Sequence, residues 1–189
     1  MLASYGSNRI IIGEYHGDTL KRAALRPVTR TSGLLRIDGR DLRCMLGEGG
    51  ISARKQEGDG TTPCGLLPLR RVLYRADRLP PPACASLARE PIGPDDGWCD
   101  DPASPDYNRP VQLPHPARHE RLWREDAIYD LLAVLGYNDD PVQRGRGSAI
   151  FLHVARVDER PTRGCLALNL ADLGWALAAG LTEIEVPED

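Results

Sequence analysis

The chain has 189 residues, a formal net charge of −3 at neutral pH, 41% hydrophobic residues and 27% charged residues. This balance is typical of a globular protein and excludes a disordered or collagen-like chain. The excess of acidic residues argues against a dedicated nucleic-acid binder, which needs a surplus of cations. A length of this order predicts a single domain over residues 1–189.

Short apolar runs bounded by turns fill the first third of the chain and predict β-strands. These runs are Arg9–Tyr15, Leu34–Ile37, Leu42–Leu46 and Leu66–Tyr74. The segment Gly47–Gly65 contains six glycines. It therefore predicts a loop that turns tightly or closely approaches another group.

A segment rich in proline and aspartate, Leu79–Pro116, occupies the middle of the chain. Its prolines forbid a long helix, and it is too long for a plain connection. We therefore expect a loop over residues 79–116 that covers a site as a lid. Trp98 and Asp100 stand in a polar and aromatic cluster within it. The alternative is that the segment only packs, with Trp98 in the core.

The last third predicts strands followed by one helix. Ala127–Leu135 and Ser148–Val157 are apolar enough for two strands, although the residue types of the first also suit a helix. Leu170–Ala179 is the clearest helix, because Asn169 suits its N-cap and leucines share one face. Glu183–Val186 predicts a final strand. The expected fold class is mainly β with one helix near the C-terminus.

One cysteine and one histidine suit nucleophilic catalysis. His153 lies inside the predicted strand Ser148–Val157, and Cys165 follows Gly164 at a sharp connection. On neighbouring strands, the imidazole would lower the pKa of the thiol and accept its proton. The glycine would let backbone N–H groups face a developing oxyanion. A buried cysteine and a core histidine are a commoner explanation of such a pair, so these residues alone leave both open.

Several sequence blocks, taken in order, resemble the L,D-transpeptidase catalytic domain family of the YkuD type. Ser148–His153 followed by Pro161–Leu168 resembles the catalytic signature, in which a histidine and a spacer precede Ser/Thr-x-Gly-Cys. Gly58–Gly65, which reads GDGTTPCG, resembles a glycine-rich block of the family. Other blocks resemble a branch common in proteobacteria: Trp98–Pro102, Tyr107–Pro110 and Tyr137–Asn138. The resemblance runs from roughly Leu34 to Leu177.

This resemblance implies a sandwich-like or barrel-like YkuD fold and peptidoglycan crosslinking through a cysteine thioester. Cys165 matches the nucleophile and His153 the general base. Gly164 and Cys165 match the turn that holds the oxyanion, and Thr162 takes the Ser/Thr place that supports it. Many members have histidine where this chain has Arg163, so we expect Arg163 to reach a substrate carboxylate instead. Many also have arginine or asparagine at the place of Ala167.

The resemblance and the lid together predict the substrate contacts. Trp98 is expected to form an apolar wall, and Asp100 or Asp101 to face a substrate ammonium. The full set of expected substrate-binding residues is Arg163, Thr162, Trp98, Asp100, Tyr137 and Asn138. The expected partners are peptidoglycan stem peptides, as donor and as acceptor, and carbapenem-type β-lactams are expected to acylate Cys165. No nucleic acid and no transmembrane segment are expected.

No cofactor is implied and no metal site is expected. His115 and His119 have a spacing that zinc accepts on a helix, but prolines flank the first and no third ligand pairs with them. Four other cysteines are expected to be packing or unpaired residues, although an exported protein would allow one or two disulfides among them. They are Cys44, Cys64, Cys84 and Cys99.

Several alternatives stay open at this point. Water in place of an amine would make the protein an L,D-carboxypeptidase or endopeptidase, and an idle Cys165 would make it a peptidoglycan-binding domain. The linkage, 3,3 or 1,3, is undecided. The substrate predicts a periplasmic location, although Met1–Gly6 lacks the start of a signal peptide and no stretch approaches ~18 apolar residues.

Overall fold

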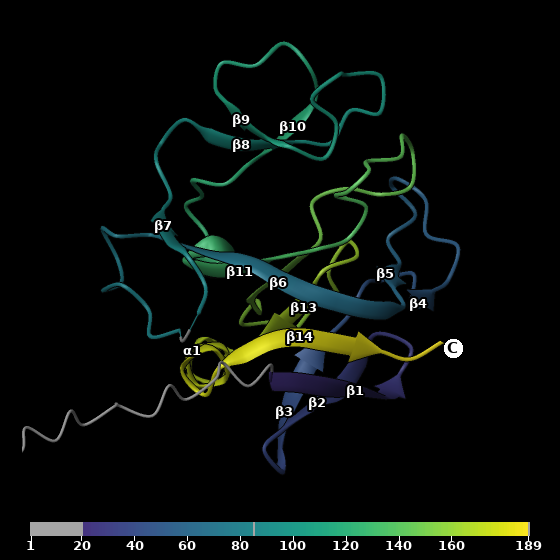
Figure 1. Cartoon of the computed structure of the whole chain (residues 1–189), viewed down its shortest axis with the longest axis vertical. Helices are drawn as coiled ribbons and strands as arrows, with labels where there is room; N and C mark the ends of the chain where they lie inside the picture. The colour runs from purple at the N-terminus through teal and green to yellow at the C-terminus, as the bar shows by residue number, and fades with distance from the viewer. Residues whose placement is uncertain (1–20, 85, 189) are drawn as a thin grey trace, which may run out of the picture.

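Strands dominate the computed structural model, which describes residues 21–84 and 86–188 (Figure 1). In this part of the chain one nine-stranded sheet bends round until β11 pairs with β6, which closes it as a barrel. In sheet order its strands are β11 (Leu131–Leu135), β12 (Phe151–Val154), β13 (Leu166–Leu168), β3 (Arg40–Met45), β2 (Ser32–Ile37), β1 (Lys21–Thr29), β14 (Leu181–Val186), β6 (Gly65–Tyr74) and β7 (Arg89–Pro91). The expected mainly β class is confirmed.

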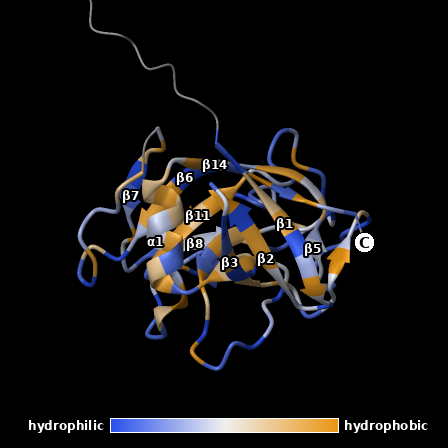
Figure 2. Ribbon diagram, turned by 90° about the horizontal axis from the view of Figure 1, so that it is seen from below, coloured by the Kyte–Doolittle hydropathy of each residue, from blue (hydrophilic) through white to orange (hydrophobic). Residues whose placement is uncertain are grey.

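The barrel interior is filled by the apolar side chains that alternate along these strands. Figure 2 shows the hydrophobic and hydrophilic residues along the ribbon of the barrel. Helix α1 (Leu170–Ala178) packs against the barrel, and Leu173 and Leu177 join the same core. Its predicted N-cap is correct, since Asn169 Oδ1 accepts a hydrogen bond from the backbone N–H of Asp172 at 2.9 Å. No helix in the described residues is long and apolar enough to cross a membrane.

A second apolar cluster lies on the outer face of β11 and β12. Successive side chains of a strand point to opposite faces, so Leu132 and Phe151 turn away from the barrel interior. A three-stranded sheet covers them, formed by β10 (His119–Arg121), β8 (Asp96–Cys99) and β9 (Pro110–Gln112). Figure 1 shows this small sheet beyond β11, on the side away from β1–β3. Trp98 joins the layers, its ring standing edge-on to Phe151 at 5.3 Å.

Three sequence predictions need correction. Residues 79–116 are not a plain loop, because β7, β8 and β9 form within them by pairing with β6 and with β10. The predicted strand Ala127–Leu135 is wrong at its start, where Ala127–Tyr129 forms a short 3-10 helix, η1, before β11 begins. The strand predicted at Ser148–Val157 is shorter in the structure, where only Phe151–Val154 (β12) forms a strand. The strand predicted at Arg9–Tyr15 lies outside the described residues.

Candidate active site

Cys165 and His153 lie on the same face of two neighbouring parallel strands. In the β12–β13 ladder His153 stands opposite Ala167, and Cys165 is two residues before Ala167. Residues two apart along an extended chain point to the same side. Both side chains are buried beneath the small sheet, His153 at 5% and Cys165 at 8% exposure. The sequence predicted this juxtaposition from a strand, a loop and a second strand.

The Cys165 thiol carries its proton in this environment. Its Sγ donates to the carbonyl of Ala149 at 3.2 Å and accepts the backbone N–H of Phe151 at 3.4 Å. Burial raises the pKa of Cys165 to about 12, and the charge of Glu120 adds to this increase. The lowered thiol pKa expected from the sequence is therefore not found, because burial outweighs any favourable charge.

His153 is held as a neutral base. Its Nδ1 lies 2.9 Å from the carbonyl oxygen of Val154, which only accepts, so Nδ1 carries the proton and Nε2 keeps a free lone pair. Burial lowers the pKa of His153 to about 4. The ring of Tyr129 stands edge-on to the imidazole at 5.4 Å and fixes its orientation. At neutral pH the pair is therefore a thiol beside an unprotonated imidazole.

The turn before Cys165 is tied by a threonine, as the sequence predicted for Thr162. Its Oγ1 donates to the carbonyl of Cys165 at 2.6 Å and accepts the N–H of Gly164 at 3.1 Å. The N–H of Gly164 is thus used within the turn, which leaves the Cys165 N–H as the donor to offer an oxyanion. Gly164 has φ +128°, and a Cβ there would lie 2.8 Å from the carbonyl oxygen of Thr61. Only glycine fits this position.

Comparison with known families decides what this arrangement belongs to. The family model of the L,D-transpeptidase catalytic domain, YkuD, matches residues 29–179, which is more than half of the chain. The chain belongs to this family. YkuD domains are cysteine-dependent L,D-transpeptidases, so the resemblance read from the sequence blocks is confirmed. No curated protein and no solved structure matches the chain.

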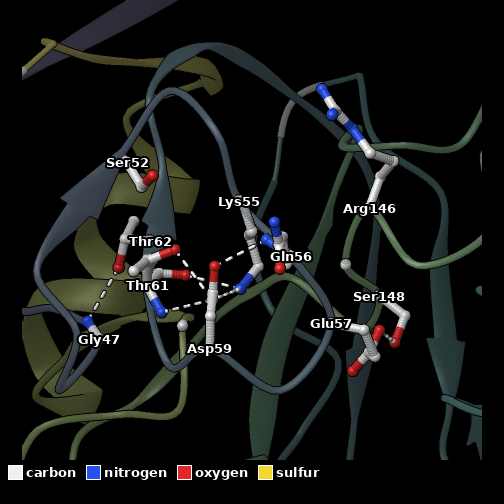
Figure 3. A network of polar contacts seen from close by, with 12 residues as sticks. Gly47, Ser52, Lys55, Gln56, Glu57, Asp59, Thr61, Thr62, Arg146 and Ser148 are labelled. Atoms are coloured by element: carbon white, nitrogen blue, oxygen red, sulfur yellow. Dashed lines mark hydrogen bonds and ion pairs between the residues drawn. The ribbon is translucent and has the colours of Figure 1, made fainter.

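A buried lysine lies against the Thr162–Cys165 turn of this YkuD domain. Lys55 is 4% exposed, and its Nζ donates to Asp59 Oδ1 at 3.0 Å and to the carbonyl of Thr61 at 2.7 Å (Figure 3). A Cβ on Gly164 would lie 3.1 Å from Nζ, so the ammonium touches the turn from behind. Its charge lowers the pKa of Cys165 and partly offsets burial. The sequence analysis missed Lys55, although Lys55 and Lys21 are the lysines of an arginine-rich chain.

Segment 79–116 is fastened to the surroundings of Cys165 by a buried asparagine. Asn108 Oδ1 accepts the indole N–H of Trp98 at 2.9 Å and the backbone N–H of Ala149 at 3.0 Å. Its Nδ2 donates to the carbonyls of Tyr137 at 3.1 Å and Asn138 at 2.7 Å. The segments around β8, before β12 and after β11 thus meet at one side chain. Asn108 stood in a family-like block but was not singled out.

A second set of hydrogen bonds joins segment 79–116 to the glycine-rich segment Gly47–Gly65. Glu57 Oε2 accepts a hydrogen bond from the hydroxyl of Ser148 at 2.7 Å (Figure 3). It also accepts one from the hydroxyl of Tyr107 at 2.5 Å. The Tyr107 oxygen in turn accepts the backbone N–H of Gly147 at 3.0 Å. The short strands β4 (Ile51–Ser52) and β5 (Thr62–Pro63) pair within the same segment. The predicted loop Gly47–Gly65 is therefore held in place by strand pairing and by side-chain hydrogen bonds to its neighbours.

The residues predicted to bind substrate have different surroundings. Arg163 belongs to the Thr162–Cys165 turn, and its side chain is exposed. The Asp100 carboxylate accepts from Arg118 Nε at 3.0 Å. The Tyr137 hydroxyl donates to the carbonyl of Arg146 at 2.8 Å. Asn138 Nδ2 donates to backbone carbonyls on the following loop. Trp98 is buried, which is the packing alternative weighed for it.

The remaining cysteines and histidines are not assembled into a site. All five cysteines are free thiols, so the disulfides left open by the sequence do not form here. His115 Nε2 lies 3.2 Å from Asp106 Oδ2, while His119 Nδ1 lies 2.8 Å from the carbonyl of Ala117. Within residues 21–84 and 86–188, no three His, Cys, Asp or Glu side chains are grouped to hold a metal ion.

Proposed function

We propose that this YkuD domain crosslinks peptidoglycan stem peptides through a thioester on Cys165. The observation that supports it best is the placement of a buried thiol and a free imidazole Nε2 on one face of β12 and β13. Sγ attacks a peptide carbonyl of the donor as Nε2 accepts the thiol proton. The C–N bond breaks and His153 returns the proton to the departing amine. The acceptor amine then attacks the thioester, and the sulfur leaves with a proton.

The neutral resting pair sets the order of these events. Because burial keeps the Cys165 thiol protonated and His153 unprotonated, the proton moves during attack rather than before it. The Cys165 N–H stabilises the developing oxyanion. The Lys55 ammonium, one layer behind, adds a positive potential on the side of the turn.

Transfer to an amine instead of water requires the site to be shielded. The lid is built for this, since Trp98 and Asn108 hold it against Phe151 and Ala149. We assign Arg163 to a carboxylate of the stem peptide, because its guanidinium is exposed beside the nucleophile. An Arg163→Ala protein with an unchanged KM for the donor would refute that assignment. We keep Asp100, Tyr137 and Asn138 as proposed donor contacts, whereas Trp98 packs against Phe151.

The test is mass spectrometry of purified muropeptides incubated with the protein, with Cys165→Ala as the control. Donors with three, four and five stem residues are offered together, and each dimer is fragmented to locate its bond. Dimers that depend on Cys165 support the proposal, and their fragments separate 3,3 from 1,3 linkage. Shortened monomers alone favour a carboxypeptidase or endopeptidase. No change with any donor favours a binding domain.

The proposal carries two further expectations. Its substrate lies outside the cytoplasmic membrane, so we place the protein's action in the periplasm. A carbapenem would acylate Cys165, because a strained β-lactam carbonyl presents the same electrophile to the thiol. The mass of the intact protein would then rise by that of the drug, and the Cys165→Ala protein would stay unmodified.

A further inference from the structure

Glu120 points at the catalytic face from the small sheet above it. In the β10–β8 ladder Glu120 stands directly opposite Trp98, and paired residues share one face of a sheet. Trp98 is directed at Phe151, so Glu120 is directed at the same surface. Its Oε1 accepts the hydroxyl of Tyr129 at 2.6 Å, and the Tyr129 ring contacts His153. The carboxylate therefore lies over the face that carries Cys165 and His153.

The surroundings of this carboxylate lack a direct cation. No arginine, lysine or histidine of the described chain forms an ion pair with Glu120, and its Oε2 accepts no hydrogen bond from those residues. Arg124 and Arg163 act on it only through space. Burial raises the pKa of Glu120, and its charge raises the pKa of Cys165. Glu120 is only partly buried, and every fully buried side-chain oxygen of the described residues has a hydrogen-bond partner. The unpaired Oε2 therefore keeps some exposure and is open to a group that arrives with the substrate.

We propose that Glu120 binds a primary ammonium group of the peptide substrate beside Cys165. This inference rests on the proposed function and names a feature of its substrate. The ammonium belongs either to the diamino acid of the donor or to the acceptor peptide. The free Oε2 accepts its N–H groups, while the exposed Arg163, which acts on Glu120 only through space, suits a carboxylate. A bound ammonium also cancels the charge that opposes thiolate formation.

A structural role is the rival explanation, in which Glu120 only orients Tyr129 and thereby His153. Two variants separate the roles. Glu120→Gln keeps the size and an acceptor for the Tyr129 hydroxyl but removes the charge. Tyr129→Phe keeps the charge but removes the hydrogen bond. Binding is measured by calorimetry in the Cys165→Ala background, which prevents turnover.

The ligands are a stem tetrapeptide with a free side-chain amine and the same peptide with that amine acetylated. An acceptor peptide is prepared in the same two forms. We expect the Cys165→Ala protein to bind one free-amine peptide about tenfold more tightly than its acetylated form. Glu120→Gln should abolish this preference, and Tyr129→Phe should retain it. The peptide that shows the preference, donor or acceptor, identifies the source of the ammonium.

Two outcomes overturn the inference: Cys165→Ala protein that does not prefer either free amine, or Glu120→Gln protein that keeps the preference. Failure of the proposed function has a different signature. If the protein prefers a free amine, yet the protein with intact Cys165 yields neither dimers nor shortened monomers, the ammonium site is supported and the transpeptidase function is refuted. If the protein forms dimers but shows no amine preference, the transpeptidase function is supported and the ammonium site is refuted.

Discussion

Asn108 and Ala149 are joined by a hydrogen bond of 3.0 Å from the Ala149 N–H to the Asn108 side-chain oxygen. Ala149 has φ 53°, an uncommon value for a residue with a side chain, and its carbonyl accepts the Cys165 thiol at 3.2 Å. Asn108, in segment 79–116, thus holds the left-handed residue whose carbonyl accepts a hydrogen bond from the Cys165 thiol. The geometry of this segment and that of Cys165 are consequently coupled.

Asn108→Ala should damage both stability and activity. It removes four hydrogen bonds of a buried side chain and leaves backbone groups unpaired, so we expect a loss of about 2–4 kcal/mol in the free energy of unfolding. Denaturant unfolding measures the loss, and dimer formation measures activity. The control is Asn169→Ala at the start of α1, expected to cost about 1 kcal/mol and leave activity unchanged at a temperature where both proteins are folded. Full activity in Asn108→Ala would disprove the coupling.

Gly164→Ala should abolish activity. The Cβ of the new alanine would lie 2.8 Å from the Thr61 carbonyl oxygen and 3.1 Å from Lys55 Nζ. The Thr162–Cys165 turn therefore has to move. Gly65→Ala is a matched control, because Gly65 also has a positive φ, +104°, but nothing lies within 4 Å of its added Cβ. Both variants carry backbone strain of about 1–3 kcal/mol. The prediction is wrong if the two lose activity equally when compared at matched folded fractions.

Thr162 should tolerate serine and not valine. Serine keeps a hydroxyl that donates to the Cys165 carbonyl and accepts the Gly164 N–H, whereas valine keeps only the shape. We expect Thr162→Val to lower kcat about tenfold or more, because displacing a nucleophile by a fraction of an ångström weakens catalysis steeply. Single-turnover kinetics measures the step. Equal rates for the serine and valine proteins would show that the turn does not depend on this hydroxyl.

Acid should destabilise the fold through His153. Its pKa is about 4 when folded and near 6.5 when unfolded, so between these values the unfolded chain binds more protons and stability falls as pH falls. Between pH 7 and pH 5 this group alone should remove about 2 kcal/mol. Unfolding of the native protein and of His153→Gln is followed over this range. An equal pH dependence in the two proteins would rule out a buried neutral His153.

Sequence patterns predicted those elements whose signal is local. Strands β2 and β6 and helix α1 follow from apolar alternation or periodicity with a cap, and the Gly-Cys turn follows from residue type. The small sheet does not, because β8 and β10 are short, partly polar and stabilised by pairing across about twenty residues of chain. The start of Ala127–Leu135 failed because its apolar residues suit several conformations. Strand β1 begins with two charged residues, Lys21 and Arg22, and contains Arg26 and Pro27, and it was not predicted.

The same distinction applies to the site. Cys165, His153 and Thr162 were found because they stand in recognisable spacing. Asn108, Lys55 and Glu120 also meet groups that are distant in the sequence. Asn108 donates to the carbonyl of Tyr137, 29 residues further on, Lys55 approaches Gly164, and Glu120 lies on a strand that pairs with β8. Asn108 stands in the family-like block Tyr107–Pro110, but the local sequence around Lys55 and Glu120 marks neither as part of the site. Lys55 has the strongest sequence signal of the three, because it is one of two lysines in a chain that otherwise uses arginine.

The central claim is that Cys165 carries the acyl group, and intact-protein mass spectrometry tests it most directly. The protein is mixed with a tetrapeptide donor, without acceptor, and quenched in acid within the first turnovers. We predict a mass increase equal to the donor acyl group, removed by hydroxylamine, mapped to the Cys165 peptide and absent from Cys165→Ala. Turnover of the donor without any adduct, or an adduct that persists in Cys165→Ala, would contradict the account.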